Sequence, residues 1–333
     1  MTQPMHASPG DAGFRSVQRR LAGLLGGVGM EMGGAPLEAL HVSAAEPPRL
    51  RASPVIEGHA LRAVRVGDPT PGFGAFLDGT QASRVVGYCD GMPIVFGSVA
   101  GVVRVRRNRR HVTWARGPIV QRRLYAPLGF LPNGICDALR DDGVEVVDTS
   151  QPDEHGERPG THPFSLLERA VHFVQADRER VERQLAEEWC ARERDALFVD
   201  GGIQGSEAVA ASHCVVGVVK SHRTLYVEGD ALRVVLGLRA GHRSTAFRIA
   251  APRRAPVASW YLRLRDPAGR DPMWGLVRVE AAVPNAGEDL AARADRISRW
   301  ILAEASPIAL PDSRWDKMVY GIRDCEQFLA AVC

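Results

Sequence analysis

The stretch that decides the fold runs from residue 73 to residue 105, FGAFLDGTQASRVVGYCDGMPIVFGSVAGVVRV. It contains three apolar runs, Phe73–Leu77, Val85–Cys89 and Pro93–Val105, rich in the β-branched and aromatic residues that favour strands. Asp90-Gly91 lies between the last two runs, and this dipeptide between apolar runs is a strong hairpin signal. The segment therefore predicts antiparallel strands joined by short turns, and a further strand is expected at 112–120.

The rest of the chain predicts an α/β fold. A loop rich in Pro, Gly and charge at residues 149–163 precedes a long helix that ends near Glu193. Ser165 and Glu168 form a capping box that would begin this helix, and its apolar residues keep a helical spacing. We expect further strands at 196–199, 214–219, 232–238, 245–250, 257–264 and 274–281, then helices at 288–305 and 313–331. Such an order predicts a mixed sheet flanked by helices.

Length and composition restrict the class of protein. The 333 residues are 45% hydrophobic and 24% charged, which is typical of a globular protein and excludes disorder, collagen and coiled coil. No apolar stretch approaches the roughly 18 residues of a membrane span, and no secretion signal is recognisable, so we expect a cytoplasmic protein. Residues 1–60 are poorly patterned and predict an N-terminal extension with one helix at about 14–25, before a single domain over 61–333.

The basic residues are almost all arginine. The formal net charge is only +3, yet the chain has forty arginines and two lysines. High-GC codon usage is sufficient to explain the total, whereas local clustering bears on function. Positive charge and one aromatic ring gather in a strand and turn at Arg104, Arg106, Arg107, Arg109, Arg110 and Trp114. This cluster suits a phosphate backbone with base stacking, and the equal alternative is an edge strand or hairpin tip guarded by charge.

Two apolar runs end in the same dipeptide, Asp78-Gly79 and Asp200-Gly201. A carboxylate at the end of a buried strand is rigidly held and can face a cleft, and hard divalent cations prefer oxygen ligands. Two such cations can share carboxylates while they activate water and stabilise a leaving oxygen. The alternative is that each Asp-Gly only makes a turn. Because the pattern occurs twice, the sequence supports a metal site as well as two turns, and both interpretations stay open.

The long helix before Asp200 offers a further carboxylate. Glu168 and Glu182 lie about 21 Å apart along the helix, so only one of them can join the same site. Glu182 flanks the apolar stripe of the helix, which favours it over Glu168. A solvent-exposed position is the alternative for any glutamate on so charged a helix.

The order of motifs along residues 70–325 resembles the NurA family of prokaryotic nucleases. The matching pieces are FLDG at 76–79, the helix with Glu182, LFVDG at 197–201, VGVVK at 216–220, SWYLRL at 259–264 and WGLVRVE at 274–280. The resemblance implies an RNase H-like fold related to Piwi domains. It also implies a manganese-dependent 5′-to-3′ exonuclease with single-strand endonuclease activity, which acts in DNA end processing and repair as a homodimer with a hexameric HerA-type translocase.

By matching motifs, Asp78, Glu182 and Asp200 are the expected ligands of two Mn²⁺ or Mg²⁺ ions, so a metal-dependent DNA nuclease is the predicted function. The family's C-terminal histidine is missing, because no histidine occurs after His242, and Asp316 is the expected substitute. The alternative for Asp316 is a helix-dipole interaction. Lys220 would neutralise either a phosphate near the metals or a structural carboxylate.

Two other functions stay open at this point. One is a non-catalytic nucleic-acid-binding or assembly subunit that keeps the fold without the metal site. The other is a metal-dependent phosphohydrolase of small nucleotides, against which the arginine cluster argues.

Overall fold

The computed structural model describes residues 9–25, 30–32, 49–108, 110–115, 117–141, 143–152, 156–305 and 320–332. Its strands are β1 (Met30–Met32), β2 (Arg49–Leu50), β3 (Ala63–Arg65), β4 (Ala75–Cys89), β5 (Met92–Arg107), β6 (Arg110–Thr113), β7 (Ile119–Ala126), β8 (Glu145–Asp148), β9 (Leu197–Asp200), β10 (Val215–Val219), β11 (Thr224–Leu225), β12 (His242–Ser244), β13 (Phe247–Ile249), β14 (Val257–Arg263) and β15 (Leu276–Ala281). Its α-helices are α1 (Pro9–Leu25), α2 (Asn133–Asp141), α3 (Pro163–Arg192), α4 (Glu207–Ala210), α5 (Gly229–Leu236), α6 (Leu290–Glu304) and α7 (Tyr320–Val332).

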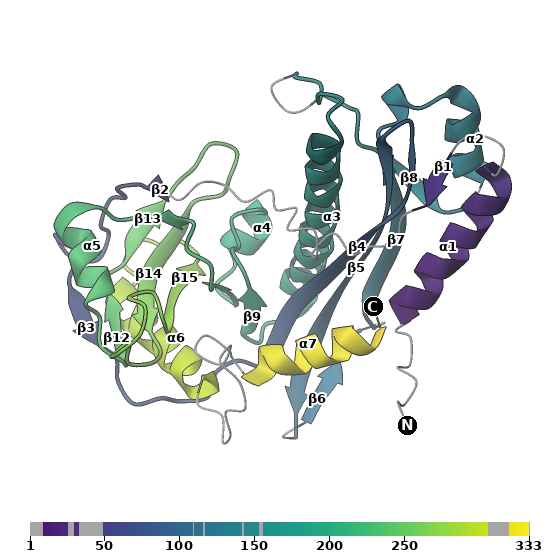
Figure 1. Ribbon diagram of the computed structural model, residues 1–333. Coiled ribbons are helices and arrows are strands. Elements are labelled where there is room, and N and C mark those ends of the chain that lie inside the picture. Colours follow the sequence, from purple (N-terminus) through teal and green to yellow (C-terminus); the bar gives the residue numbers. More distant parts are fainter. Residues whose placement is uncertain are drawn as a thin grey trace.

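The long hairpin of β4 and β5 is the centre of the molecule (Figure 1). Asp90 and Gly91 both have positive φ angles, 48° and 77°, which suits the tight turn that joins twisted antiparallel strands. The two strands pair from Ala75 opposite Val105 to Cys89 opposite Met92, with one irregularity between Val85 and Gly87. The hairpin predicted from Asp90-Gly91 is therefore confirmed.

One large sheet contains most of the strands, in the order β3-β12-β14-β15-β10-β9-β4-β5-β7-β8. Within it, β7, β5 and β4 are antiparallel neighbours, whereas β9 pairs parallel with β4, and β10 parallel with β9. The helix α3 lies between β8 and β9 in the chain. Three antiparallel strands continued by two parallel ones across a long helix make an RNase H-like sheet, so the predicted mixed sheet flanked by helices is confirmed.

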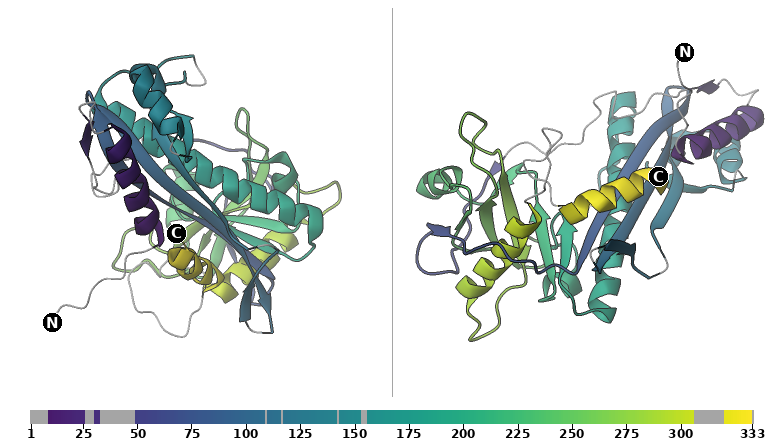
Figure 2. Two further views of the ribbon diagram at one scale, coloured as in Figure 1. Left: turned by 90° about the vertical axis from the view of Figure 1, so that its right-hand side faces the viewer. Right: turned by 90° about the horizontal axis from the view of Figure 1, so that it is seen from below.

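The helices α3 and α7 lie on opposite faces of the β4–β5 hairpin (Figures 1 and 2). Because side chains alternate along a strand, Phe76 faces α7 and Leu77 faces α3. A Cβ added to Gly321 of α7 would meet the Phe76 ring at 2.4 Å, and one added to Gly101 of β5 would meet Val181 of α3 at 2.7 Å. Glycine at both positions allows each helix to approach the sheet closely.

The strands β3, β12, β13, β14 and β15 and the helix α6 form the other part of the molecule, on the left in Figure 1. The buried strands β14 and β15 pair along their length, and Trp260 on β14 donates its indole N–H to Ser298 of α6 at 2.9 Å. Glu57 and Arg243 form a buried bidentate ion pair beneath this layer, at 2.7 and 2.9 Å. In the described part of the chain, no helix has the length and apolar character that crossing a membrane requires.

Two predictions about the helical segments were wrong. The helix α3 begins at Pro163 with His162 as its N-cap, so Ser165 and Glu168 lie inside the first turns and form no capping box. Residues 229–236 form the helix α5, where a strand at 232–238 was expected. Proline at the first helical position and local tertiary packing outweigh the sequence signals used there. The predicted final helix is confirmed over 320–331, while its first part, 313–319, lies outside the described residues.

Candidate metal centre

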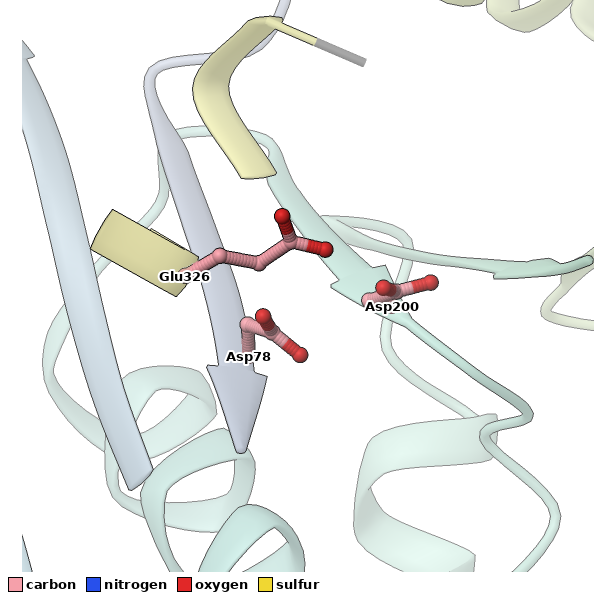
Figure 3. Close-up of side chains that lie close together, drawn as sticks. All are labelled: Asp78, Asp200 and Glu326. Atoms are coloured by element: carbon pink, nitrogen blue, oxygen red, sulfur yellow. The ribbon is translucent and has the colours of Figure 1, made fainter. Parts of the chain in front are cut away.

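Three carboxylates from three different elements converge at the middle of the sheet (Figure 3). Asp78 lies on β4, Asp200 ends β9, and Glu326 lies on α7. One oxygen of each lies within 4.8 Å of the others. The structure thus brings together two residues predicted from the sequence and one that the sequence analysis missed.

Parallel pairing of β4 with β9 places the two aspartates side by side. Phe76 pairs with Phe198 and Leu77 with Val199, so Asp78 and Asp200 come next on adjacent strands. Asp78 shares the strand face of Phe76, which is the face that α7 covers. Gly201 follows with a φ of 137°, a conformation that side chains other than glycine rarely adopt, and the chain turns away directly after the carboxylate.

The charged groups of the site interact strongly with one another. Burial raises the pKa of Asp78 well above its usual value, and the neighbouring Asp200 carboxylate raises it further, while Lys220 opposes both. Asp78 is only 7% exposed and accepts a hydrogen bond from the Gly79 N–H at 2.8 Å. Lys220, just after β10, donates to Asp200 at 2.7 Å. Clustered carboxylates with one partner cation leave negative charge that a divalent ion would neutralise.

Glu326 supplies a carboxylate from the last helix to this cluster, where the sequence had suggested Asp316. Its neighbours Ile322, Cys325 and Leu329 are buried on the face of α7 that packs on the sheet, and the Cys325 thiol donates to the Phe76 carbonyl at 3.4 Å. Glu326 lies at the edge of this stripe. A glutamate flanking the apolar stripe of the last helix was the available signal. Asp316 itself lies outside the described residues.

Glu182 lies on the other face of β4. A Cβ on Gly79 would meet its Oε1 atom at 2.3 Å, so its carboxylate sits directly over this glycine. Arg178, one turn earlier on α3, donates to the same oxygen at 2.5 Å. Burial raises the pKa of Glu182 to about 7 even though Arg178 lowers it. Glu182 is thus near the three carboxylates but outside their cluster, while Glu168 is exposed on the first turns of α3.

Two hollows open at the site. One has a volume of about 600 Å³ and is lined by the three carboxylates together with Gly79, Thr80, Arg178, Gly201, Val219, Lys220, Ser221 and Ala330. The other, of about 350 Å³, lies between α3 and the loop after β9, and Glu182, Arg183, Ile203, Ser206 and Arg254 are among its lining residues. Arg178 and Asp200 border both hollows, so a ligand in either one reaches the carboxylates.

The structure engages Arg104, Arg106 and Trp114 of the predicted cluster in contacts within the fold. Arg104 donates to Asp324 of α7 and to Thr113, both at 2.6 Å, and Arg106 forms a bidentate pair with Glu304. Trp114 is buried against Trp189 and donates to Glu193 at 2.8 Å. The predicted base stacking on Trp114 is therefore wrong, because its ring is in the core, and Arg104 and Arg106 serve the fold.

The turn of the same cluster keeps exposed charge. Arg107 and Arg110 are exposed at the tip, on either side of Asn108 with its φ of 49°, and Arg109 lies outside the described residues. Arg263 and Arg278, whose orientation the sequence left open, are both buried: Arg263 donates to four main-chain carbonyls and Arg278 pairs with Glu280 at 2.5 Å. Arg107 and Arg110 are thus exposed at a hairpin tip, and both interpretations of their charge, nucleic-acid contact and a guarded hairpin, stay predictions.

No family model matches this chain, and no curated protein matches its sequence. Among solved structures, the chain is similar to the crystal structure of the NurA nuclease from Sulfolobus solfataricus, with a TM-score of 0.44 and 10% sequence identity. The alignment covers 83% of this chain and 81% of that chain. A likeness this distant decides nothing by itself, so the fold assignment rests on the strand order and the site on its own geometry.

The donor set fits a hard divalent cation. Its three ligand residues are carboxylates, and the most buried of them, Asp78, forms no ion pair within the described part of the chain. Mg²⁺ and Mn²⁺ take oxygen ligands of this kind and usually keep several waters in an open site. Asp78, Asp200 and Glu326 are the residues that would hold such an ion.

Proposed function

We propose that this protein is a metal-dependent nuclease that hydrolyses phosphodiester bonds in DNA. The observation that carries the proposal is the convergence of Asp78, Asp200 and Glu326 at the wall of a hollow that also contains Lys220. Three carboxylates at the centre of an RNase H-like sheet, beside a cation and open to solvent, supply the groups that phosphodiester hydrolysis needs.

Each residue has a distinct part in this proposal. Asp78, Asp200 and Glu326 bind one or two Mn²⁺ or Mg²⁺ ions, and Glu182 is a further ligand when its carboxylate is released. A bound ion supplies charge stabilisation at the phosphate and activation of water. Lys220, which pairs with Asp200 in the free protein, can turn toward a non-bridging phosphate oxygen of the strand.

The motif resemblance supports finer points of the same proposal. We infer 5′-to-3′ exonuclease and single-strand endonuclease activity in DNA end processing and repair, in the cytoplasm. The partners we propose are DNA ends and single strands, a second copy of the chain in a homodimer, and a hexameric HerA-type translocase. Arg107 and Arg110 at the hairpin tip, and Arg109 between them, remain candidates for nucleic-acid contact.

Cleavage of end-labelled DNA tests this function. The protein is incubated with single-stranded and duplex DNA labelled at the 5′ or the 3′ end, with Mn²⁺, Mg²⁺ or EDTA. We expect degradation with Mn²⁺, none with EDTA, and loss of activity in Asp78→Ala and Asp200→Ala. Asp230→Ala is the matched control, because this carboxylate is 92% exposed and far from the cluster in the fold. Activity retained in both site variants would refute the proposal.

The ion pair between Lys220 and Asp200 supports a second candidate function. A lysine that neutralises Asp200 at 2.7 Å lets the fold persist without a metal, as a non-catalytic nucleic-acid-binding subunit requires. Calorimetric titration with Mn²⁺ separates the two candidates. Absence of metal binding together with intact DNA affinity would favour the non-catalytic subunit.

A further inference from the structure

Arg178 of α3 contacts the central strand β4 and also lines the hollow in front of the metal centre. Its Nη1 donates to Glu182 Oε1 at 2.5 Å, and its Nε donates to Gln81 Oε1 of β4 at 3.0 Å. The side chain is 24% exposed and lines both hollows. One guanidinium thus joins a carboxylate of α3, the central strand and the space in front of the three converging carboxylates.

Glu182 is placed for metal binding but engaged elsewhere. Its carboxylate lies over Gly79, the residue directly after Asp78, and is 13% exposed. It is close enough for its charge to act on Asp78, yet its oxygens do not belong to the group within 4.8 Å. To join the cluster, the carboxylate would have to leave its place over Gly79, and the hydrogen bond from Arg178 opposes that movement.

A phosphate would compete with Glu182 for the same guanidinium. The planar fork of arginine suits carboxylates and phosphates alike, so a phosphate would compete with Glu182 for the Nη1 donor of Arg178. A strand that enters the larger hollow brings its phosphates to the wall where Arg178 is exposed. The guanidinium can therefore exchange its protein partner for a substrate phosphate without leaving the site.

We propose that Arg178 is a positioning residue that withholds Glu182 from the metal centre until a nucleic-acid phosphate draws the guanidinium away. This inference rests on the proposed nuclease function. It makes metal and strand bind cooperatively, because each favours the state in which the pair is broken, and such coupling is reciprocal. The free protein then has a weakened metal site, and the site becomes complete only when a strand is bound.

The test is a pair of double-mutant cycles on Arg178→Met and Glu182→Gln. Mn²⁺ affinity is measured by calorimetry without DNA, and affinity for a fluorescent single-stranded oligonucleotide is measured in EDTA, where no cleavage occurs. We expect Arg178→Met to bind Mn²⁺ about tenfold more tightly than the wild type, within the usual range of coupling between sites. We expect Glu182→Gln, which releases the guanidinium, to bind the oligonucleotide several-fold more tightly than the wild type does.

The double variant separates release of a partner from loss of a charge. If Arg178 acts through Glu182, the gain in Mn²⁺ affinity disappears in the Arg178→Met/Glu182→Gln protein. If the gain persists there, removal of a positive charge explains it and the inference is overturned. Arg183→Met removes an equal charge from α3 at the position next to Glu182, and this variant is expected to leave Mn²⁺ affinity nearly unchanged. Arg178→Lys keeps the charge and should restore part of the wild-type behaviour.

The outcomes distinguish this inference from the function on which it rests. Mn²⁺ binding by the wild type that Arg178→Met leaves unchanged would overturn the inference alone. Absence of Mn²⁺ binding by the wild type and by Arg178→Met would overturn both. Circular dichroism melting of each variant confirms that the compared proteins are folded. If Arg178→Met does not fold, Arg178→Lys replaces it in the test.

Discussion

The glutamates on the two faces of β4 differ in the groups that they contact. On the α7 face, Glu326 points at Asp78 and Asp200, and the arginine nearby, Arg104, binds Asp324 instead of Glu326. On the α3 face, the arginine binds the glutamate itself, so Glu182 is held by Arg178 over Gly79. An arginine beside a carboxylate of this site therefore has one of two roles. It either holds the helix that carries the carboxylate, as Arg104 does, or binds the carboxylate itself, as Arg178 does.

The largest expected effect comes from removing the carboxylate of the α7 face. Glu326→Gln should lose Mn²⁺ affinity by about 100-fold, the upper end of the loss that follows removal of groups supporting a metal site. Glu182→Gln should lose about tenfold or less in the absence of DNA, because Arg178 already engages that carboxylate. Calorimetry on both proteins checks the order. Equal losses would mean that the two faces are equivalent in the free protein.

The next effect comes from filling the space under each helix. Gly79→Ala places a methyl group against the Glu182 carboxylate, and Gly321→Ala places one against the Phe76 ring. Both should lower the free energy of unfolding by about 1–3 kcal/mol through overpacking. Only Gly79→Ala moves a carboxylate directly, so only it should also slow DNA cleavage by about tenfold at saturating Mn²⁺, roughly 1.4 kcal/mol of activation free energy.

Urea unfolding and initial cleavage rates measure these two quantities separately. The contrast is lost if Gly321→Ala slows cleavage as much as Gly79→Ala does at equal stability. Such a result would show that the position of α7 is as sensitive as that of Glu182.

A smaller effect is expected from loosening α7 at a distance from the metal. Arg104→Met removes the hydrogen bonds to Asp324, to Thr113 and to the His111 carbonyl. Because Asp324 is two residues before Glu326, we expect a loss of about 1–3 kcal/mol of stability and a decrease of a few-fold in Mn²⁺ affinity. Thermal unfolding and calorimetry provide the measurements. Unchanged metal affinity would show that the apolar stripe of α7 is enough to place Glu326.

The smallest effect is a gain in stability. The folded-state pKa of Asp78 is raised, so its carboxylate weighs against the folded state once the pH exceeds the unfolded value. In EDTA at pH 8, Asp78→Asn should therefore stabilise the protein by about 1–2 kcal/mol, and the difference should shrink as the pH falls toward 5. Mn²⁺ should raise the melting temperature of the wild type only. A destabilised Asp78→Asn protein in EDTA would contradict this assignment.

The sequence was sufficient to predict what depends on local pattern. Asp90-Gly91 specified the hairpin because its turn chemistry is local, and Asp78 and Asp200 stood out because each follows an apolar run. Asp200 does end its strand, whereas β4 continues past Asp78 to Cys89. Glu326 could not be found in this way, because its relation to Asp78 depends on how α7 is rotated on the sheet. The run LRVVL at 232–236 resembled a strand and forms part of α5, since β-branched residues only weakly oppose a helix that tertiary packing favours.

The arginines show the same division. Clustering around residues 104–110 was visible in the sequence, yet strand alternation alone did not reveal that Arg104 and Arg106 would meet carboxylates on α7 and α6. Those partners lie about two hundred residues away in the chain. The exposed arginines of the turn and the ion-paired arginines of the strand have similar local sequences and different physical roles.

The position of α7 in the chain gives the metal centre an order of assembly. Every strand of the sheet precedes this helix, and Asp78, Glu182 and Asp200 are all synthesised before Glu326. Because folding during translation proceeds from the N-terminal side, a growing polypeptide can build the sheet while the third carboxylate is still absent. The metal centre therefore lacks its third carboxylate until α7 has been synthesised and has docked on the sheet.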